Sequence, residues 1–262
     1  MNFLKNWSII RPQIEWARPG RTRLRMKKLE WFLKDWELFQ ELFTQQKDFQ
    51  NLTLLPALDD KNVTNGSLTY HYFYQDLFVA QCLFRDNPHL HVDFGSRIDG
   101  FVAHVASFRT LEVLDIRPME QSIPNVLTRQ ADLMGDVSHL ANYADSVSSL
   151  HVIEHLGLGR YGDPININGH LIGLENIHKI LKPGGKFYFA TPFGPQRIEF
   201  NTHRIFNLSY LMEYLTPRYE VLNFAYVDDG NNLHPSVELT SENIKSNLGQ
   251  NFACAIFELR KK

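Results

Sequence analysis

The sequence predicts an α/β protein, a doubly wound, seven-stranded, mainly parallel sheet with an N-terminal helical extension. Two observations support this fold class. From His91 onward, short apolar segments typical of buried strands alternate with segments of helical periodicity. The first of these strands also leads directly into a turn with glycines and then a helix, in the sequence HVDFGSRIDGF (residues 91–101). Doubly wound sheets hold nucleotide-like ligands at such strand–turn–helix units.

The individual elements follow from the same patterns. We expect strands at residues 91–94, 111–116, 126–130, 147–153, 186–190, 219–227 and 252–259, and helices at residues 70–85, 101–108, 171–181 and 205–214. The sequence Lys182-Pro183-Gly184-Gly185 is typical of the end of a helix. Because no clear helix separates the last two strands, we expect them to pair antiparallel, with residues 228–251 as an excursion between them.

The first 65 residues differ in character from the rest of the chain. Residues 11–28 are rich in lysine and arginine, and residues 29–43 carry large apolar side chains near helical spacing, namely Leu29, Phe32, Leu33, Trp36, Phe39 and Phe43. We therefore predict a basic, amphipathic helical extension (1–65) and a main domain (66–262). The extension is expected to pack on the main domain. Peripheral contact of residues 11–43 with an anionic membrane, or with a phosphorylated substrate, is the alternative.

Composition excludes several classes of protein. The formal net charge of −2 does not favour a nucleic-acid partner. The two cysteines, Cys82 and Cys254, lie far apart in apolar surroundings, which indicates reduced core residues of a cytoplasmic protein. The N-terminus lacks the apolar region of a signal peptide, and no apolar run reaches the ~18 residues of a transmembrane helix. We therefore expect a cytoplasmic protein without a transmembrane segment.

Five motifs occur in a set order: VDFG (92–95), LEVLDIRP (111–118), ADL (131–133), SSLHVIEH (148–155) and LKPGGKFYFATP (181–192). On these motifs, the chain from about His89 to Arg260 resembles the class I S-adenosylmethionine (SAM)-dependent methyltransferases. The resemblance implies a Rossmann-like methyltransferase fold for residues 66–262, SAM as cofactor and methyl transfer as the activity. VDFGSRIDGF and SLHVIEHLGLGRYGDP together also resemble a poorly characterised bacterial family associated with surface-polysaccharide biosynthesis. One departure is the turn, where four residues separate Gly95 from Gly100 instead of closely spaced glycines.

The cofactor-binding residues that the resemblance implies lie in or near the ends of strands: Asp93, Gly95, Ser96, Arg97, Asp115, Asp132, Leu133 and Ser149. Asp93 either organises the glycine turn or accepts a ligand hydrogen bond. Asp115 would accept hydrogen bonds from the ribose hydroxyls, and Asp132, with Leu133 beside it, would bind adenine. The alternatives are a turn cap for Asp115, a helix N-cap for Asp132 and a surface charge for Arg97.

The acceptor side is expected around His151, Glu154 and His155. Their H-x-x-E-H pattern also occurs in zinc peptidases, where it must lie on a helix. Here it follows a strand and precedes glycines, so we expect no metal site. A histidine can instead take a proton from an acceptor hydroxyl near neutral pH, with Glu154 orienting it. The alternative is that the three residues are structural and none acts as a base. Ser149 is expected to face the amino-acid end of the cofactor or the acceptor.

Further substrate contacts are expected from two segments. The polar, glycine-rich loop 157–170 offers Arg160, Tyr161 and Asp163 as a substrate clamp or lid. His203 precedes the last helix and is expected to approach the same cleft. The alternatives are a plain exposed loop and a simple helix start.

The sequence therefore predicts a SAM-dependent methyltransferase that O-methylates a sugar, a nucleotide-linked sugar or another capsule or lipopolysaccharide precursor. A phosphate or phosphoramidate acceptor would suit the basic arm and Arg160. Two alternatives stay open. A nicotinamide-dependent oxidoreductase is disfavoured because the G-x-G-x-x-G turn is missing. A non-catalytic SAM-binding protein would account for the altered glycine turn.

Overall fold

The computed structural model describes residues 22–262 except 46, 49–50, 53–56, 59–60 and 62–69. The chain divides into two compact units, residues 1–67 and 68–262, and each is described by itself. Among the described residues, no helix has both the length and the apolar character needed to cross a membrane.

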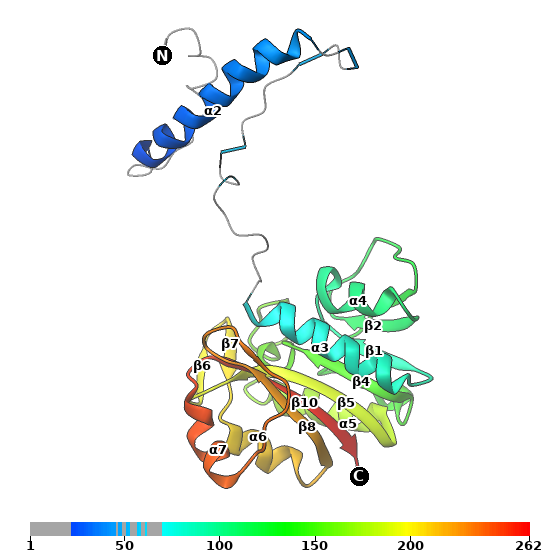
Figure 1. Cartoon of the computed structure of the whole chain (residues 1–262). Coiled ribbons are helices and arrows are strands. Elements are labelled where there is room, and N and C mark those ends of the chain that lie inside the picture. Colours follow the sequence, from blue (N-terminus) through cyan, green and yellow to red (C-terminus); the bar gives the residue numbers. More distant parts are fainter. Residues whose placement is uncertain (1–21, 46, 49–50, 53–56, 59–60, 62–69) are drawn as a thin grey trace. The chain divides into compact units, whose positions relative to one another are not determined.

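The second unit is built on one central sheet (Figure 1). Its strand order is β3-β2-β1-β4-β5-β10-β8-β9, and β1 to β5 run parallel. The strands are β1 (His91–Phe94), β2 (Leu111–Asp115), β3 (Val126–Gln130), β4 (Ala144–Leu150), β5 (Leu181–Phe193), β8 (Tyr219–Val227), β9 (Leu233–His234) and β10 (Ala253–Lys261). Without the two-residue β9, this is the predicted seven-stranded sheet. The predicted antiparallel pairing of the last two long strands is confirmed, because β10 pairs antiparallel with both β5 and β8.

Helices cover both faces of this sheet. The helices of this unit are α3 (Tyr70–Asp86), α4 (Ala103–Ala106), α5 (Gly169–Ile180), α6 (Leu208–Leu215) and α7 (Ser241–Ser246). On one face, Leu83 of α3 and Val105 of α4 share a buried apolar cluster with Ile256 of β10. On the other face, Ile177 of α5 shares a cluster with Phe187 of β5, which also includes the buried side of α6. The fold is thus a three-layer α/β/α domain, as predicted.

The helix after the glycine turn differs from the expected 101–108. A π-helical turn, η1 (Ile98–Val102), comes first, and the four-residue α4 follows it. Gly100 has non-helical angles (φ −124°, ψ −109°), which interrupts the regular helix. A Cβ at this position would collide with Oδ2 of Asp76 on α3. A side chain at position 100 would thus displace the carboxylate of Asp76, which fits glycine at this contact with α3.

Other boundaries also differ from the prediction, and β5 runs from Leu181 to Phe193 instead of from residue 186 to 190. Strand β4 ends at Leu150 instead of residue 153, because His151 has φ +56° and a 3₁₀ turn, η3 (Ile153–His155), follows. The helix expected at 205–214 begins only at Leu208, where the side chain of Asn207 accepts a hydrogen bond from the backbone of Ser209. Before it lies an unpredicted hairpin of β6 (Arg197–Glu199) and β7 (His203–Ile205). The predicted excursion 228–251 contains β9 and α7.

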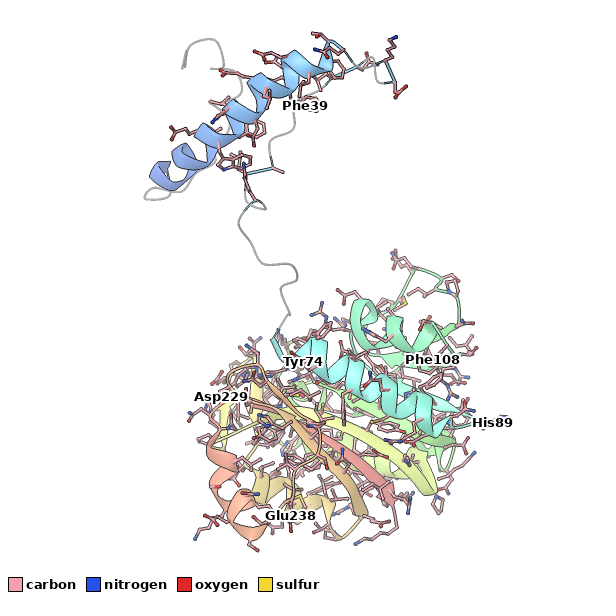
Figure 2. The ribbon with its side chains drawn as sticks, in the orientation of Figure 1. Phe39, Tyr74, His89, Phe108, Asp229 and Glu238 are labelled. Atoms are coloured by element: carbon pink, nitrogen blue, oxygen red, sulfur yellow. The ribbon has the colours of Figure 1, made fainter. Side chains whose placement is uncertain are left out.

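The first unit contains α2 (Thr22–Phe43). Leu29 and Leu33 are buried against Leu58, with Trp31 packed beside them. Further along α2, Leu38, Phe39 and Leu42 are exposed; Figure 2 labels Phe39. The described part of the unit thus confirms a helix with apolar residues at helical spacing. Most of the predicted basic arm, residues 11–28, lies outside the described residues.

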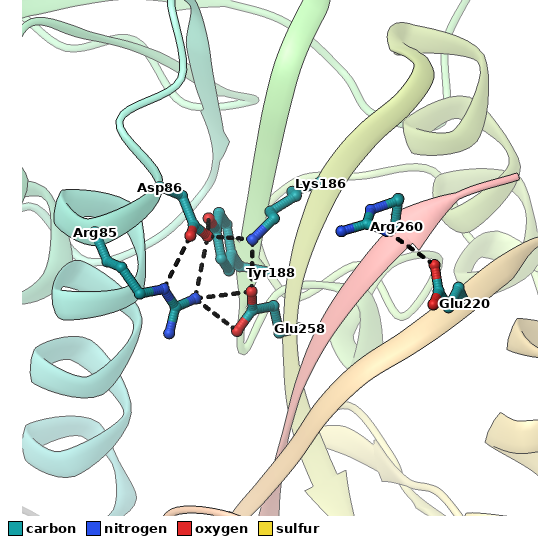
Figure 3. Close-up of polar contacts among 7 residues, drawn as sticks. All are labelled: Arg85, Asp86, Lys186, Tyr188, Glu220, Glu258 and Arg260. Atoms are coloured by element: carbon teal, nitrogen blue, oxygen red, sulfur yellow. Dashed lines mark hydrogen bonds and ion pairs between the residues drawn. The ribbon is translucent and has the colours of Figure 1, made fainter.

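A cluster of charged groups ties α3 to the sheet (Figure 3). Asp86, at the end of α3, accepts hydrogen bonds from Arg85, Lys186 and Tyr188. Glu258 of β10 accepts hydrogen bonds from Arg85 and Lys186 at 2.7–2.9 Å. Burial alone would raise the pKa of Asp86, but these hydrogen bonds lower it to about 2.

Asp86→Asn should therefore destabilise the protein by about 1.5–3 kcal/mol at neutral pH, because it removes charge-assisted hydrogen bonds from a half-buried position. The folded-state pKa of Asp86 lies below its ordinary value of 3.8. The stabilisation is then fully present above about pH 4 and is lost as the pH falls toward 2. Urea unfolding of both proteins between pH 7 and pH 3 measures this difference.

The matched control is Glu220→Gln. Glu220 pairs with Arg260 on the same sheet (Figure 3), but both side chains are about half exposed. Such exposed pairs contribute about 0–1 kcal/mol. An equal loss of stability in the two variants would contradict the structural role given to Asp86.

Candidate functional site

A cavity of about 640 Å³ lies at the carboxyl ends of β1, β2, β3 and β4. Its lining includes residues that end or follow these strands, among them Gly95, Asp115, Ala131 and Leu150. In the sheet, β1 lies between β2 and β4, so the strand order reverses at this point. Doubly wound sheets bind their ligands at such a switch point.

Asp93 stabilises the turn after β1 through hydrogen bonds with Ser96. Gly95 has φ +67°, and a Cβ there would lie 3.2 Å from both γ-carbons of Val152, which follows β4. The buried carboxylate of Asp93 accepts hydrogen bonds from Ser148 and from the backbone and side chain of Ser96. Burial raises the pKa of Asp93 to about 6 despite these hydrogen bonds. Asp93 does not line the cavity. It organises the turn, and its place outside the cavity lining does not support the cofactor contact that the resemblance implies for it.

The rest of the turn forms one rim of the cavity. Ser96 is buried and lines it, as does Arg97. The guanidinium of Arg97 pairs with the carboxylate of Asp99 at 2.8 Å and lies 5.1 Å from the ring of Tyr72. The two predicted residues, Ser96 and Arg97, are thus at the cavity, and Arg97 is paired within the turn itself.

Asp115, at the end of β2, also lines the cavity. Its Oδ1 accepts a hydrogen bond from the backbone N–H of Arg117 at 2.8 Å, and the guanidinium of Arg117 pairs with the same carboxylate. Asp115 therefore caps the turn and also lines the cavity, and its contact with ribose hydroxyls stays a prediction. Arg117 also lies 4.7 Å from the ring of Tyr161, so it joins two walls of the cavity.

Asp132 and Leu133 follow β3 and both line the cavity. Oδ1 of Asp132 accepts a hydrogen bond from the backbone N–H of Met134 at 2.8 Å. The carbonyl oxygen of Leu133 accepts a hydrogen bond from the buried side chain of Asn176 on α5. These contacts fix a polar and an apolar group at the end of the cavity formed by β3.

Ser149 is not at the cavity. Its hydroxyl is buried and has no hydrogen-bond partner among the described residues. Side chains alternate along β4, so Ser149 shares the face of Val147, which packs in the cluster with α5. The predicted place of Ser149 beside a cofactor or acceptor is therefore not supported.

His151 and Glu154 form a buried pair beside the cavity. Nδ1 of His151 lies 2.6 Å from Oε1 of Glu154, and both side chains are more than nine-tenths buried. Burial alone would lower the pKa of His151, but Cys254 and Glu154 beside it raise the pKa above its usual range. His151 lines the cavity, yet its Nε2 is a buried atom.

His155 is oriented differently. Its Nδ1 lies 2.7 Å from the carbonyl oxygen of Thr202, and its Nε2 lies 3.9 Å from Oε1 of Glu154. A carbonyl oxygen only accepts hydrogen bonds, so Nδ1 carries the hydrogen and the neutral ring presents a lone pair at Nε2. Burial lowers the pKa of His155, which favours this neutral form. In this neutral form a histidine can act as a general base, and His155 also lines the cavity.

The loop after η3 closes the cavity on this side. Asp163 accepts hydrogen bonds from the backbone N–H groups of Gly157, Gly159 and Tyr161, so it organises the loop. Tyr161 lines the cavity with its ring edge-on to His155. Arg160 lies outside the lining and donates to the carbonyl of Thr202. Of the three residues predicted as a clamp, Tyr161 and Asp163 thus line the cavity. Arg160 lies outside it and links the loop to Thr202.

His203 on β7 does not line the cavity. It pairs with Glu199 and its ring stacks on Phe252 at 5.2 Å, while the ring of His155 lies 6.4 Å away. Asp229, labelled in Figure 2, accepts hydrogen bonds from the backbone N–H groups of Asn251 and Phe252. His203 is therefore part of a supporting layer behind His155.

Sequence reasoning missed the roles of two arginines. Arg117 pairs with the acid at the end of β2, and Arg204 is almost fully buried. Arg204 donates hydrogen bonds to the carbonyl oxygens of Glu154 and Leu156, so it holds the turn that carries His155. These partners lie about 50 residues earlier in the chain, so no local pattern reveals the contacts.

Comparison with solved structures places the fold among known proteins. The chain is similar to the 1,6-didemethyltoxoflavin-N1-methyltransferase of Burkholderia thailandensis with S-adenosylhomocysteine (SAH) bound, with TM-score 0.51 and 12% identity over 72% of this chain and 79% of that chain. The [4+2]-cyclase SpnF gives TM-score 0.51 and 13% identity over 74% and 88%. The N-methyltransferase NodS from Bradyrhizobium japonicum WM9, in complex with SAH, gives 0.47 and 13% over 72% and 85%.

The fold is therefore the Rossmann-like fold of the class I SAM-dependent methyltransferases. Residues 109–262 match the model of the family described as "Caenorhabditis protein of unknown function, DUF268", and the chain belongs to this family. A comparison with curated protein sequences gave no match. Because one similar structure is a cyclase, the fold alone does not fix the reaction. The link to surface polysaccharides stays a prediction.

Proposed function

We propose that this protein is a SAM-dependent methyltransferase that acts on a hydroxyl oxygen of a small molecule. The observation that carries the proposal is the make-up of the cavity. Two carboxylates, Asp115 and Asp132, lie at its β2 and β3 side, and a neutral histidine, His155, lines its other side. The two carboxylates can accept hydrogen bonds from a nucleoside. The histidine can take the proton that a hydroxyl acceptor must lose.

The residues present fit SAM. The Gly95 turn allows close backbone approach at the switch point, and the Asp115 carboxylate can accept hydrogen bonds from ribose hydroxyls. Asp132 can accept a hydrogen bond from the adenine amino group, with the apolar Leu133 beside the ring. When bound, SAM supplies an electrophilic methyl group on a sulfonium.

The acceptor end is assigned to His155 and its neighbours. His155 would take the hydroxyl proton at Nε2, and the Glu154 carboxylate 3.9 Å away would stabilise the imidazolium that forms. Arg97 and Arg117 line the same cavity, which suits an acceptor with phosphate groups. We therefore propose nucleotide-linked sugars and other phosphorylated polysaccharide precursors as the first acceptors to test, with phosphate and phosphoramidate oxygens next.

The test is a turnover assay with methyl-labelled SAM, a panel of free sugars, sugar phosphates and nucleotide-sugars, and a comparison set of small amine and carbon acceptors. We expect SAH and a methyl ether to form with at least one phosphorylated hydroxyl compound. Methyl transfer to nitrogen or carbon acceptors alone would contradict a hydroxyl acceptor. Tight SAM binding without SAH formation on the whole panel would favour the non-catalytic alternative.

Gly95→Ala should weaken SAM binding about tenfold or more. Alanine at φ +67° costs about 1–2 kcal/mol, and its Cβ would press on Val152, which also lines the cavity. The matched control is Gly184→Ala, where φ is +74° but nothing lies within 4 Å of the new Cβ. Both variants should lose unfolding free energy through the strained φ, Gly95→Ala the more because of Val152, but only Gly95→Ala should lose affinity in calorimetry. Equal SAM affinities of the two variants would show that the Gly95 turn is not part of the binding site.

A further inference from the structure

Three side chains from separate elements meet beside the cavity. His71 lies on α3, His151 follows β4 and Cys254 lies on β10. One nitrogen of each histidine and the sulfur of Cys254 all lie within 4.8 Å of one another. The three residues are buried, with exposed fractions of 7% for His71 and 0% for Cys254, and 7% for the side chain of His151.

The Nε2 atom of His151 is buried and makes no hydrogen bond of ordinary geometry within the described part of the chain. Buried polar groups are almost always paired, so this atom calls for a partner, and the group beside it is the thiol of Cys254. The opposite nitrogen, Nδ1, is fixed by Glu154 at 2.6 Å. A carboxylate that orients one ring nitrogen while the other nitrogen is free is the arrangement found around metal-bound histidines.

We propose that His71, His151 and Cys254 bind a Zn²⁺ ion. Two imidazole nitrogens and one thiolate match the donor preference of zinc, whereas Mg²⁺ and Ca²⁺ prefer oxygen ligands. Tetrahedral zinc with bonds of 2.0–2.3 Å separates its ligand atoms by about 3.3–3.6 Å. Because the three ligand atoms already lie within 4.8 Å of one another, the side chains need to move together by at most about 1.5 Å.

Binding would release the thiol proton of Cys254, and any proton on Nε2 of His151, to solvent. The Cys254 sulfur lies 3.5 Å from Oε1 of Gln75 and 3.6 Å from the carbonyl oxygen of Ala255, and it also interacts with the ring of His151. Three protein ligands leave a fourth coordination position, which in catalytic zinc sites holds water or substrate. Because His151 also lines the cavity, the ion would lie next to the acceptor end.

The test uses the full chain, stripped of metal with a chelator and titrated with ZnCl₂ against a chromophoric zinc chelator. We expect one equivalent of Zn²⁺ to bind, and Co²⁺ in its place to give a thiolate-to-cobalt charge-transfer band. Cys254→Ser and His71→Gln should weaken zinc binding by at least about 100-fold and remove or alter that band. Glu154→Gln keeps all three ligands and should weaken binding about 10–100-fold.

The matched control is Cys82→Ser, because Cys82 is also a buried free thiol but lies outside the cluster. It should bind zinc like the natural protein. Circular dichroism reports whether each variant folds; if Cys254→Ser does not, the cobalt spectrum of the natural protein decides. Absence of the charge-transfer band, or equal zinc affinity in folded Cys254→Ser and Cys82→Ser, would overturn the proposal. Zinc binding is measured without SAM, so this result is independent of the proposed function.

Discussion

His155→Ala is expected to lower the rate of methyl transfer by about 10²–10⁴-fold while leaving SAM affinity unchanged. The variant removes a cavity-lining ring whose Nε2 carries the lone pair, because Nδ1 donates to the carbonyl oxygen of Thr202. Steady-state turnover with the fastest acceptor of the panel, together with SAM calorimetry, measures both quantities. His139→Ala, at an exposed position outside the cavity lining, is the control.

The pH profile gives an independent readout of the same role. Burial lowers the pKa of His155 below 6.5; Glu154 opposes this shift, and Arg160 and His151 add to it. The neutral ring is the base, so the rate should be level through neutral pH and fall on the acid side, below pH 6.5. His155→Ala should lose this limb. A rate for His155→Ala equal to that of His139→Ala would show that His155 is structural.

Asp115→Ala is expected to weaken SAM binding by about 100-fold or more. The carboxylate would accept two ribose hydroxyl hydrogen bonds, and hydrogen bonds to a charged group contribute about 1.5–3 kcal/mol each. In the free protein, Asp115 pairs with Arg117, whose side chain is 54% exposed. Because such a pair is worth at most about 1 kcal/mol, ribose hydroxyls can share the carboxylate at little cost.

The matched control for Asp115 is Asp136→Ala. Asp136 accepts a backbone hydrogen bond from the residue two positions on, as Asp115 does, but it lies outside the cavity lining. Both variants lose a turn hydrogen bond, and only Asp115→Ala loses a cavity carboxylate. Calorimetry with SAM should therefore separate them. Unchanged affinity in Asp115→Ala would place the nucleoside elsewhere in the cavity.

The fold could be predicted in large part because its signals are local. Strands such as β3 (Val126–Gln130) and β8 (Tyr219–Val227) carry period-two or apolar patterns, and both match the predicted bounds. The errors arise where a tertiary contact overrides the local pattern. At Gly100 the backbone leaves the helical conformation where it approaches Asp76 of α3. A π-helical turn therefore stands where the pattern predicts the start of a regular helix. The hairpin of β6 and β7 has strands of three residues, too short to give a periodic signal.

The candidate site could be predicted only in part. Acids that follow strands, Asp115 and Asp132, line the cavity because parallel strands end at one edge of the sheet. The orientation of a side chain at a strand end is harder to foresee. Ser149 points to the sheet face that α5 covers, together with Val147, and not into the cavity. The cluster with Cys254 was missed altogether. His71 and Cys254 are 183 residues apart in the chain and come together because α3 packs on β10. Cys254, interpreted from the sequence as a core residue, is indeed buried.

Calorimetric titration of the full chain with SAM tests the central claim most directly. The cavity at the switch point predicts one binding site per chain, competition by SAH, and no comparable binding of NADH. Absence of heat at millimolar SAM, or stronger binding of NADH than of SAM, would contradict the account.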